Sequence, residues 1–511
     1  MSKGYLFPVF SAILLVFSFP PFDLYPLAWF AFLPLLWAIK DATPQVSFLR
    51  GIITGSLFFL GILYWTLYAM VDYGGLSLLW GLCLLCLLVT YLALYFGIFC
   101  YTIKQLALIE NPVFPWFASI FWVGLEYVRG HFLTGFPWEL LGDSQYKWLH
   151  FIQMADIGGV YLLSFFVILG NACLFQCLFQ KTKVAYLNLL ILLLLLGLGL
   201  LYGHNRLAFW GKKLANNPQL KIAVIQGNID QAHKWDPVYQ EATIKIYETL
   251  TKAASRQKPD LVIWPETALP FYLQLESPYR KQILKLARGT NSSLLVGSPA
   301  YEMTQTEVKY YNRAYLINKK GIIISHYDKT HLVPFGEYVP CRKLFSFIPM
   351  LANNPGDFSP GKSEMPLRFQ PGVSFGVLIC FECIFPEISQ KLVKRQANFL
   401  VNITNDAWFG YTSAPYQHLS MLVLRAVENR RAIARAANTG ISAFIDPTGQ
   451  IFKKTKLFTP AYLVGKLPLI KVKTVYTMYG DTLAFGCLCG MFILSGIYVG
   501  RRFLWKKLKK V

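Results

Sequence analysis

Three apolar, strand-like runs in this chain each end close to an ionisable side chain. In chain order, the runs and these side chains are residues 260–264 before Glu266, residues 322–327 before Lys329, and residues 375–379 before Cys380. A thiolate is the strongest nucleophile among the side chains, a carboxylate can take its proton, and an ammonium can stabilise the oxyanion formed on attack. The pattern therefore predicts an enzyme that uses a cysteine nucleophile.

Cys380 is the candidate nucleophile. It lies between a predicted strand and a helix that begins near Pro386, so backbone N–H groups are expected beside it to bind an oxyanion. Two other interpretations stay open, namely a buried structural cysteine and one half of a redox C-x-x-C pair with Cys383. Redox motifs open a helix, whereas Cys380 closes a strand, which favours the nucleophile.

Glu266 and Lys329 are the candidate general base and oxyanion-binding residue. Glu266 follows a buried strand and Pro265, which would leave its carboxylate partly desolvated and raise its pKa toward the range of a general base. A helix-capping carboxylate and a solvated loop lysine are the plainer interpretations of these two residues. Their joint presence with Cys380, each in distinctive flanking sequence, favours catalysis.

The three residues belong to a stretch with the pattern of an α/β domain. From Leu220 to residue 475, short apolar runs alternate with helical patterns, as expected for a buried sheet covered by helices. The expected strands are 221–225, 261–264, 293–297, 314–317, 322–324, 373–379, 399–403 and 441–445. The expected helices are 241–254, 279–288, 387–395 and 419–437, with turns at 319–321 and 446–449.

The rest of the chain is apolar enough to lie in a membrane. Hydrophobic residues make up 55% of the chain and charged residues 15%, whereas soluble proteins carry about 25% charged residues. Because about 20 apolar residues cross a bilayer, we expect about eight membrane helices. They are 5–20, 25–40, 51–72, 77–103, 113–129, 156–180, 184–203 and 481–500. A signal peptide over 1–20 is the alternative for the first, but Phe17–Pro20 is a poor cleavage site.

Basic residues in the short loops predict the orientation of these helices. Under the eight-helix count they alternate sides as the positive-inside rule requires, so both termini are expected in the cytoplasm. We expect an N-terminal membrane domain over 1–203 with about seven helices and a catalytic domain over 204–475. A membrane helix and basic tail over 476–511 follow. The catalytic domain would lie in the periplasm of a bacterium with an outer membrane.

Net charge and cysteine content indicate which partners to expect and whether disulfides can form. No basic helix or RNA-binding signature accompanies the net charge of +22, so nucleic acid is not an expected partner. Contact between the basic tail and anionic lipid is the simpler explanation. Only Cys341, Cys380 and Cys383 of the ten cysteines fall outside the expected membrane helices. This odd number leaves at least one unpaired thiol in an oxidising compartment.

Two further segments are expected at the membrane surface. Glu126 and Arg129 lie one helical turn apart, where they would either steady a polar headgroup or form a structural ion pair. The apolar segment 340–351 would either dip into lipid as a mobile arm or pack as a surface loop. Both interpretations stay open for each segment.

Short motifs in one order along the chain carry a resemblance to known enzymes. They are Gln226–Asn228, Lys234–Asp236, Trp264–Thr267, Lys329–Pro340, Ile379–Glu382, Asn405–Gly410 and Asn438–Gly440, with Glu126–Gly130 and Thr134–Trp138 in the membrane part. The later motifs resemble the nitrilase, or carbon-nitrogen hydrolase, superfamily, which implies a Glu–Lys–Cys triad on a four-layer α-β-β-α sandwich. With its membrane helices, the whole chain resembles the apolipoprotein N-acyltransferase family.

The resemblance implies a function for each site residue. Glu266 would be the general base, Lys329 the oxyanion stabiliser and Cys380 the nucleophile. Four more residues would support the site or bind substrate, namely Glu337 as a second carboxylate, Glu382 as a neighbour that shapes the site, Trp235 near the substrate entrance, and Phe381. The family commonly has tyrosine at the position of Phe381, so any contribution of that hydroxyl is absent here. No metal and no cofactor are implied.

The resemblance also implies a reaction and its partners. Cys380 would take an acyl chain from a phospholipid, phosphatidylethanolamine by type, as a thioester. It would pass the chain to the α-amino group of an S-diacylglyceryl-cysteine at a lipoprotein N-terminus. The enzyme would be a monomer in the bacterial inner membrane.

Two other functions stay open on the sequence alone. A triad does not reveal whether water or an amine attacks the thioester, so a membrane-tethered amidase acting on a small soluble amide is the near alternative. A transporter or channel is the distant one, and the expected spans show neither an evident internal repeat nor many charges.

Overall fold

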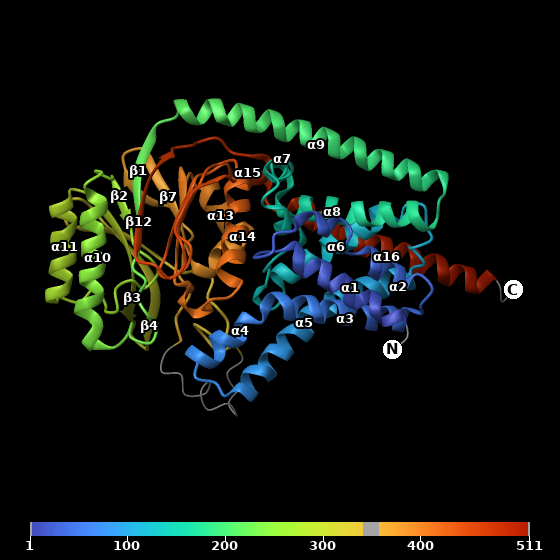
Figure 1. Cartoon of the computed structure of the whole chain (residues 1–511), viewed down its shortest axis with the longest axis horizontal. Helices are drawn as coiled ribbons and strands as arrows, with labels where there is room; N and C mark the ends of the chain where they lie inside the picture. The colour runs from blue at the N-terminus through green and yellow to red at the C-terminus, as the bar shows by residue number, and fades with distance from the viewer. Residues whose placement is uncertain (1–2, 341–356, 509–511) are drawn as a thin grey trace. The chain divides into compact units, whose positions relative to one another are not determined.

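The computed structural model describes residues 3–340 and 357–508, and the chain divides into two compact units (Figure 1). The first unit comprises Met1–Thr66, Leu79–Ala208 and Tyr479–Val511, and the second comprises Leu67–Leu78 and Phe209–Met478. Nearly all of segment 340–351, expected as a lipid-dipping arm, lies outside the described residues, as does Cys341.

The first unit is helical. Its main helices are α1 (Lys3–Ser18), α2 (Leu33–Ile39), α3 (Pro44–Leu63), α5 (Leu78–Gln105), α6 (Phe114–His131), α8 (Ala155–Phe179), α9 (Lys183–Asn216) and α16 (Thr482–Leu508). Shorter turns of helix are η1 (Tyr25–Trp29), η3 (Phe132–Thr134), η4 (Leu141–Gln145) and α7 (Leu149–Ile152), and α4 (Trp65–Tyr68) continues from the first unit into the second. A helix therefore lies at each of the expected spans.

Helix length and composition meet the expectation of eight membrane helices only in part. Among the described residues, four helices are long and apolar enough to cross a membrane: α3, α5, α8 and α9 over 183–214. The apolar helical segments 4–18, 25–39 and 482–497 are shorter. Helix α3 begins at Pro44 rather than residue 51, because Thr43 accepts a hydrogen bond from Val46 N–H as an N-cap and Pro44 suits the first turn.

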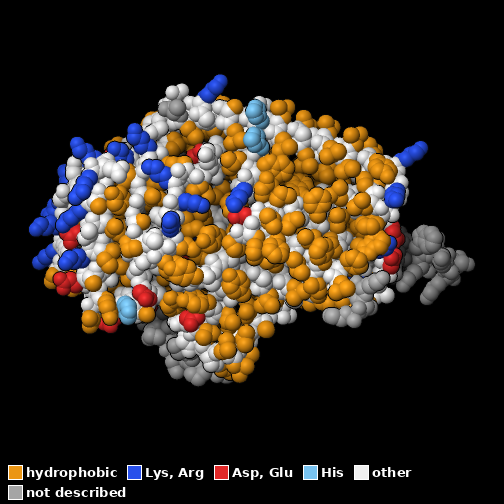
Figure 2. All heavy atoms as spheres, viewed as in Figure 1, with side chains coloured by type: hydrophobic (Ala, Val, Ile, Leu, Met, Phe, Trp, Pro, Cys, Tyr) orange, Lys and Arg blue, Asp and Glu red, His pale blue; other side chains and the backbone are white. Residues whose placement is uncertain are grey.

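The surfaces of the two units differ in composition. On the face drawn in Figure 2, hydrophobic side chains cover the helices of the first unit, whereas Lys and Arg side chains gather over α10 and α11 of the second. Leu190, Leu194 and Leu201 of α9 are each more than half exposed. Contiguous exposed apolar surface of this kind is expected where lipid replaces water.

The second unit is built on two six-stranded sheets. The first has the strand order β12-β1-β2-β3-β4-β5 and the second β11-β10-β9-β8-β7-β6. Strands of the first sheet are β1 (Gln219–Gln226), β2 (Leu261–Ile263), β3 (Ser293–Met303), β4 (Val308–Ile317), β5 (Ile323–Asp328) and β12 (Ala461–Pro468). Strands of the second are β6 (Leu367–Gln370), β7 (Val373–Ile379), β8 (Phe399–Thr404), β9 (Ile433–Ala437), β10 (Ala443–Ile445) and β11 (Ile451–Lys454).

The sheets face each other across one apolar core, and helices cover their outer faces. Apolar residues of both sheets form that core, including Ile222, Ile263, Val377 and Val401. A second core lies between the first sheet and the helices α10 (Gln240–Ser255) and α11 (Pro278–Thr290). Helices α13 (Pro386–Lys394) and α14 (Ala414–Asn429) cover the second sheet, which gives the layer order α-β-β-α (Figure 1).

Parallel pairing brings the candidate residues to one edge of the sandwich. Strands β1, β2 and β3 run parallel, as do β7, β8 and β9. Glu266 follows the end of β2, Cys380 follows β7, and Asn405 follows β8. Lys329 directly follows β5, which pairs antiparallel with β4.

The expected helix over 419–437 is wrong in its second half. Helix α14 ends at Asn429, and residues 433–437 form β9. Arg430 takes a left-handed backbone conformation (φ 49°) and caps the helix, a position that glycine usually fills. The sequence therefore contains no visible stop signal at the point where the helix ends.

Segment 67–78 belongs to the second unit, although the sequence placed part of it in a membrane helix. It contains the π-helical turn η2 (Ala69–Tyr73). The Tyr73 ring lies 5.7 Å from the ring of Trp408 in an edge-to-face arrangement, in the turn η8 (Asp406–Phe409) that follows β8. Aromatic packing of this kind holds the segment to the α/β unit.

Candidate active site

Cys380 lies at a strained elbow between β7 and the short turn η7 (Cys380–Ile384). Its φ is 51°, in the left-handed region that non-glycine residues rarely adopt. Burial and the nearby carboxylate of Glu266 raise the pKa of the Cys380 thiol well above its usual value, although Lys329 acts in the opposite direction. The resting thiol is therefore protonated and needs a base before it can attack.

Glu266 lies in hydrogen-bond reach of three groups. Its Oε1 accepts a hydrogen bond from Asn312 Nδ2 at 2.7 Å and lies 3.5 Å from Lys329 Nζ. Its Oε2 accepts one from the backbone N–H of Asn405 at 2.9 Å. The carboxylate is almost fully buried. These contacts fix its orientation without enclosing it in a close ion pair.

Lys329 is buried between two carboxylates. Its Nζ lies 2.8 Å from Glu337 Oε2 and 3.5 Å from Glu266 Oε1. Burial disfavours the ammonium, but Glu337 and Glu266 outweigh that penalty and raise the pKa of Lys329. Lys329 is therefore a permanent cation at this site.

Glu337 is held on three sides. Its carboxylate accepts hydrogen bonds from the backbone N–H of Val333 at 2.8 Å and from Asn312 Nδ2 at 2.9 Å, besides its contact with Lys329. Asn312, in the middle of β4, thus bridges Glu266 and Glu337. The sequence analysis did not single out Asn312, because a polar residue within a strand carries no local signal of its partners.

Glu382 connects the Lys329 segment to the Cys380 elbow. Its Oε1 accepts hydrogen bonds from Thr330 N–H at 2.7 Å, Thr330 Oγ1 at 2.8 Å and Tyr327 OH at 3.0 Å. Its Oε2 accepts one from Ile379 N–H at 2.7 Å. Burial raises the pKa of Glu382, and these hydrogen bonds oppose that shift. The side chain holds the two segments together rather than facing open space.

Trp235 and Phe381 lie in different surroundings. Trp235 is 48% exposed on the loop after β1. Phe381 is buried, with its ring 5.1 Å from that of Phe385 and 6.0 Å from that of His331. Phe381 therefore packs among aromatic rings and carries no hydroxyl.

Lys234, next to Trp235, is a second buried lysine near the site. Its Nζ donates to Thr267 Oγ1 at 2.7 Å and lies 3.4 Å from the backbone oxygen of Glu266. Burial lowers the pKa of Lys234 to about 8, although Glu266 and Cys380 act in the opposite direction. Thr267 has a left-handed φ of 45°, so Lys234 holds a strained turn beside Glu266.

A buried polar network lies behind the Cys380 elbow. Asp406 Oδ2 accepts from Arg435 Nη2 at 2.6 Å, and Asp406 Oδ1 lies 3.1 Å from His418 Nδ1. His418 Nε2 lies 3.1 Å from the backbone oxygen of Cys380. Sequence reasoning noted Asp406 within a motif but missed His418 and Arg435, because buried polar residues on a helix and a strand give no local signal.

Cys380 and Cys383 both carry free thiols, as do the other cysteines in the described part of the chain. Cys383 is fully buried. No disulfide therefore joins the two cysteines of the C-x-x-C pattern.

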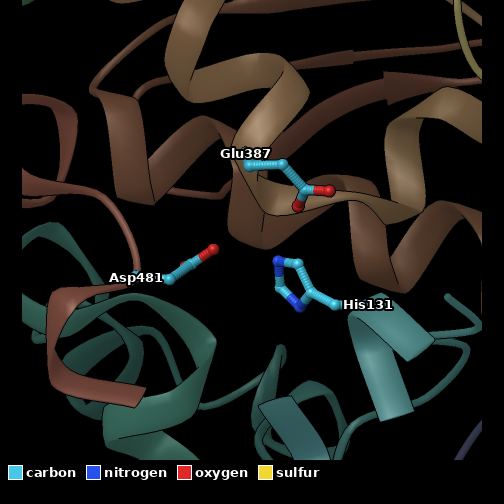
Figure 3. A group of neighbouring side chains, drawn as sticks. All are labelled: His131, Glu387 and Asp481. Atoms are coloured by element: carbon cyan, nitrogen blue, oxygen red, sulfur yellow. The ribbon is translucent and has the colours of Figure 1, made fainter. Parts of the chain in front are cut away.

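Two groups of side chains in the described ranges could ligate a metal by composition, and neither contains a triad candidate. Glu302, His326 and Asp328 form an exposed group whose carboxylates already pair with Arg313, at 2.8 Å and 2.5 Å. Figure 3 shows Glu387, in the first turn of α13, with His131 at the end of α6 and Asp481 before α16. His131 and Asp481 belong to the first unit and Glu387 to the second, so the three support no metal site.

Comparison with known proteins identifies the family. Residues 11–173 match the model described as apolipoprotein N-acyltransferase N-terminal domain, and residues 221–476 match the carbon-nitrogen hydrolase model. An apolipoprotein N-acyltransferase of Geobacter metallireducens is 44% identical over 98% of this chain and 96% of its own length. The chain belongs to the apolipoprotein N-acyltransferase family.

Other apolipoprotein N-acyltransferases match over almost the same length. The Haemophilus influenzae protein is 32% identical, with 93% of this chain and 91% of that protein covered. Among solved structures, an amidase from Nesterenkonia sp. is 22% identical and matches 49% of this chain and 90% of its own, with a TM-score of 0.37. As a member of the apolipoprotein N-acyltransferase family, the protein is a membrane enzyme with a carbon-nitrogen hydrolase domain.

Proposed function

We propose that this protein moves an acyl chain from a phospholipid, through a Cys380 thioester, to the α-amino group of the N-terminal S-diacylglyceryl-cysteine of lipoproteins. The observation that supports this most directly is the buried pair of Glu266 and Lys329, whose charges act on the Cys380 thiol, with Glu337 in contact with Lys329. Such a group supplies a base and an oxyanion-stabilising cation to one nucleophile.

The proposed arrangement in the cell follows the same assignment. Residues 1–203 and 476–511 would supply about eight membrane helices, and residues 204–475 would form the catalytic domain. The basic tail would lie in the cytoplasm and the catalytic domain in the periplasm of a bacterium with two membranes. The enzyme would act as a monomer. The apolar exposed surface of α9 supports placement in a bilayer.

In the first half-reaction Glu266 takes the proton of Cys380, whose raised pKa makes this transfer necessary. The sulfur then attacks the ester carbonyl of a phospholipid, phosphatidylethanolamine in our proposal. Negative charge forms on the carbonyl oxygen, where Lys329 and a backbone N–H of the elbow would stabilise it. The C–O bond breaks, the protonated Glu266 returns its proton to the leaving oxygen, and lysophospholipid departs.

In the second half-reaction the neutral α-amino group attacks the thioester carbonyl. Glu266, again a carboxylate, takes a proton from the attacking nitrogen. The C–S bond breaks and the sulfur receives this proton, so the amide product leaves a free Cys380 thiol. The protein begins and ends the cycle with the same protonation states, and the reaction consumes no cofactor.

Intact-protein mass spectrometry tests the proposal. Detergent-purified wild type and Cys380→Ala are incubated with phosphatidylethanolamine, and Cys83→Ala serves as the matched control because Cys83 is an exposed cysteine of α5. We expect a mass increase of one acyl chain on wild type and control only, which neutral hydroxylamine removes and a diacylglyceryl-cysteine peptide discharges.

The other outcomes separate the alternatives. No adduct on wild type, even without acceptor, would contradict the acyl-lipid donor. An adduct that water discharges as fast as the peptide does would indicate a hydrolase. Release of ammonia from a small soluble amide, without any lipid adduct, would support the amidase alternative.

A further inference from the structure

His418 donates a hydrogen bond to the backbone carbonyl of Cys380. The Nε2–O distance is 3.1 Å, and both groups lie inside the second unit, where His418 is fully buried. Because a carbonyl oxygen only accepts, Nε2 must carry a hydrogen. The neutral ring with its hydrogen on Nε2 and the doubly protonated ring both satisfy this requirement.

The neighbours of the other ring nitrogen allow either of these states. His418 Nδ1 lies 3.1 Å from Asp406 Oδ1, which would accept a hydrogen from it, and 3.1 Å from Arg435 Nη2, which would donate one to it. Burial disfavours the charged ring, but Cys383 and Asp406 outweigh that penalty and raise the pKa of His418 to about 9. In both states the Nε2–H faces Cys380.

Through the geometry of the peptide bond, the hydrogen bond from His418 also affects the N–H group that would face the substrate carbonyl. The C=O of Cys380 and the N–H of Phe381 belong to one planar peptide unit, in which they point in opposite directions. A donor that fixes the carbonyl therefore also fixes the direction of the Phe381 N–H. Donation to the carbonyl additionally polarises the peptide and strengthens its N–H as a donor.

The backbone conformation of the elbow needs support from outside, because a non-glycine residue does not favour it. Cys380 has a φ of 51°, a conformation that persists in non-glycine residues only where surrounding structure enforces it. His418 belongs to α14, Asp406 to the turn after β8, and Arg435 to β9. His418 alone contacts the carbonyl, and residues of two further elements outside the elbow hold its ring.

The network behind His418 is itself fully bonded. Arg435 donates to Asn402 Oδ1 at 2.5 Å and to Asp406 Oδ2 at 2.6 Å, and Thr404 Oγ1 donates to Asp406 Oδ1 at 2.8 Å. All of these side chains are buried. Buried polar networks of this kind are rigid when every member has its partner, which suits a group that must aim a dipole.

We propose that His418 is a positioning residue, which orients the Cys380–Phe381 peptide so that its N–H points at the oxyanion formed during acyl transfer. This inference rests on the proposed function of Cys380 as the nucleophile. It adds a second requirement to the thiol chemistry, since the elbow must present a donor as well as a sulfur.

Two rates measured on the same enzyme test the inference. The first is thioester formation from phosphatidylethanolamine, which passes through an oxyanion. The second is alkylation of Cys380 by iodoacetamide, followed by peptide mapping, which needs the sulfur but forms no oxyanion. In His418→Phe we expect thioester formation to fall by roughly 10² while alkylation changes little, and KM for the lipid to stay near wild type.

A conservative variant and a matched control complete the test. His418→Gln keeps an N–H donor near the position of Nε2 and should recover part of the lost rate. Arg431→Met removes a buried hydrogen-bonding cation at the opposite end of β8, where Arg431 donates to Ala397 O at 2.6 Å. It should match His418→Phe in lost thermal stability without a selective loss of acylation.

Two results would overturn the inference. Thioester formation and alkylation that fall together in His418→Phe would assign His418 to the folding of the elbow alone. Equal thioester formation in wild type and His418→Phe would remove any effect on the reaction. A wild type that alkylates at Cys380 but never forms a thioester would instead refute the proposed function.

Discussion

The Lys329 ammonium lies 2.8 Å from Glu337 Oε2. Its distance to Glu266 Oε1 is longer, at 3.5 Å, and Glu266 receives its shorter hydrogen bonds from the neutral donors Asn312 and Asn405. Glu337 therefore balances most of the lysine charge, and Glu266 is left without a close ion pair. The spacing explains why the site has two carboxylates for one ammonium.

Glu337→Gln should slow thioester formation by about 10–10², because Lys329 would then pair closely with Glu266 and weaken it as a base. The KM for the phospholipid should change little, since the Glu337 carboxylate is already engaged by Lys329, Asn312 and Val333. Single-turnover mass spectrometry measures the rate. Glu302→Gln, which removes a carboxylate paired with Arg313 on the surface, is the control, and an equal loss in both variants would contradict this explanation.

Glu382→Gln should loosen the connection between the Lys329 segment and the Cys380 elbow. Five donors face the carboxylate of Glu382, and an amide nitrogen in place of one oxygen would point at donors. Leaving a buried polar group unpaired costs about 1–3 kcal/mol. Thermal unfolding in detergent should show this loss, together with a lower kcat; an unchanged melting temperature would argue against the connection.

His331 should make the protein sensitive to mild acid. Burial, with the charges of Lys329 and Lys391, lowers the pKa of His331 to about 4, below the value of about 6.5 in an unfolded chain. The unfolded state binds the proton first, so this contribution to stability is complete above about pH 6.5 and declines as the pH falls toward 4. His331→Phe should lose less stability than wild type between pH 7 and pH 4.5.

Melting temperatures at several pH values check this prediction. His233→Phe is a suitable control, because His233 is an exposed histidine on the loop after β1. Parallel curves for wild type and His331→Phe would show that His331 does not titrate across this range.

Lys234 predicts a change of stability in the same direction, rising with pH, on the alkaline side. Burial lowers the pKa of Lys234 to about 8, whereas an unfolded lysine titrates near 10.4. Between these values the unfolded state holds a proton that the folded state has lost, so the stability contributed by this group rises with pH. Lys234→Met should abolish that rise.

The same variant should lower kcat, because Lys234 holds the strained Thr267 turn beside Glu266. Chemical denaturation at pH 8, 9 and 10 measures the stability trend. Lys245→Met, on the exposed face of α10, controls for loss of a positive charge. A wild type whose stability stays flat over this range would refute the buried-lysine interpretation.

Most of the candidate site could be predicted from the sequence, because each triad candidate follows an apolar strand. Short apolar runs such as 261–264 can be recognised as strands without knowing which strands they pair with. The side chain that follows such a run must then lie at the edge of the sheet. Asn312 was beyond reach, since only the pairing of β4 with β3, in which Asn312 lies opposite Pro299, places it between two carboxylates. The same holds for His418, whose contact with Cys380 depends on how α14 packs.

Two errors in the fold have local causes. Arg430 ends α14 in a conformation usually reserved for glycine, so 419–437 read as one helix. Strands β6, β11 and β12 were not expected, because an edge strand needs little apolar sequence on its outer face and gives a weak alternation. Segment 67–78 belongs to the second unit because of the tertiary packing of Tyr73. The hydrophobic periodicity of the sequence does not indicate such packing.

The pairing of β12 with β1 has a consequence for biosynthesis. Gln219 lies opposite Pro468, so the first strand of the α/β unit pairs with the last one. The first sheet is therefore complete only after β12 has been synthesised. During translation the ribosome must make nearly the whole chain while the free edge of β1 stays open to other strands. Chaperones and proteases that bind nascent chains would therefore have access to this edge until residue 468 has been synthesised. In a chain truncated before β12 the edge would stay accessible to them.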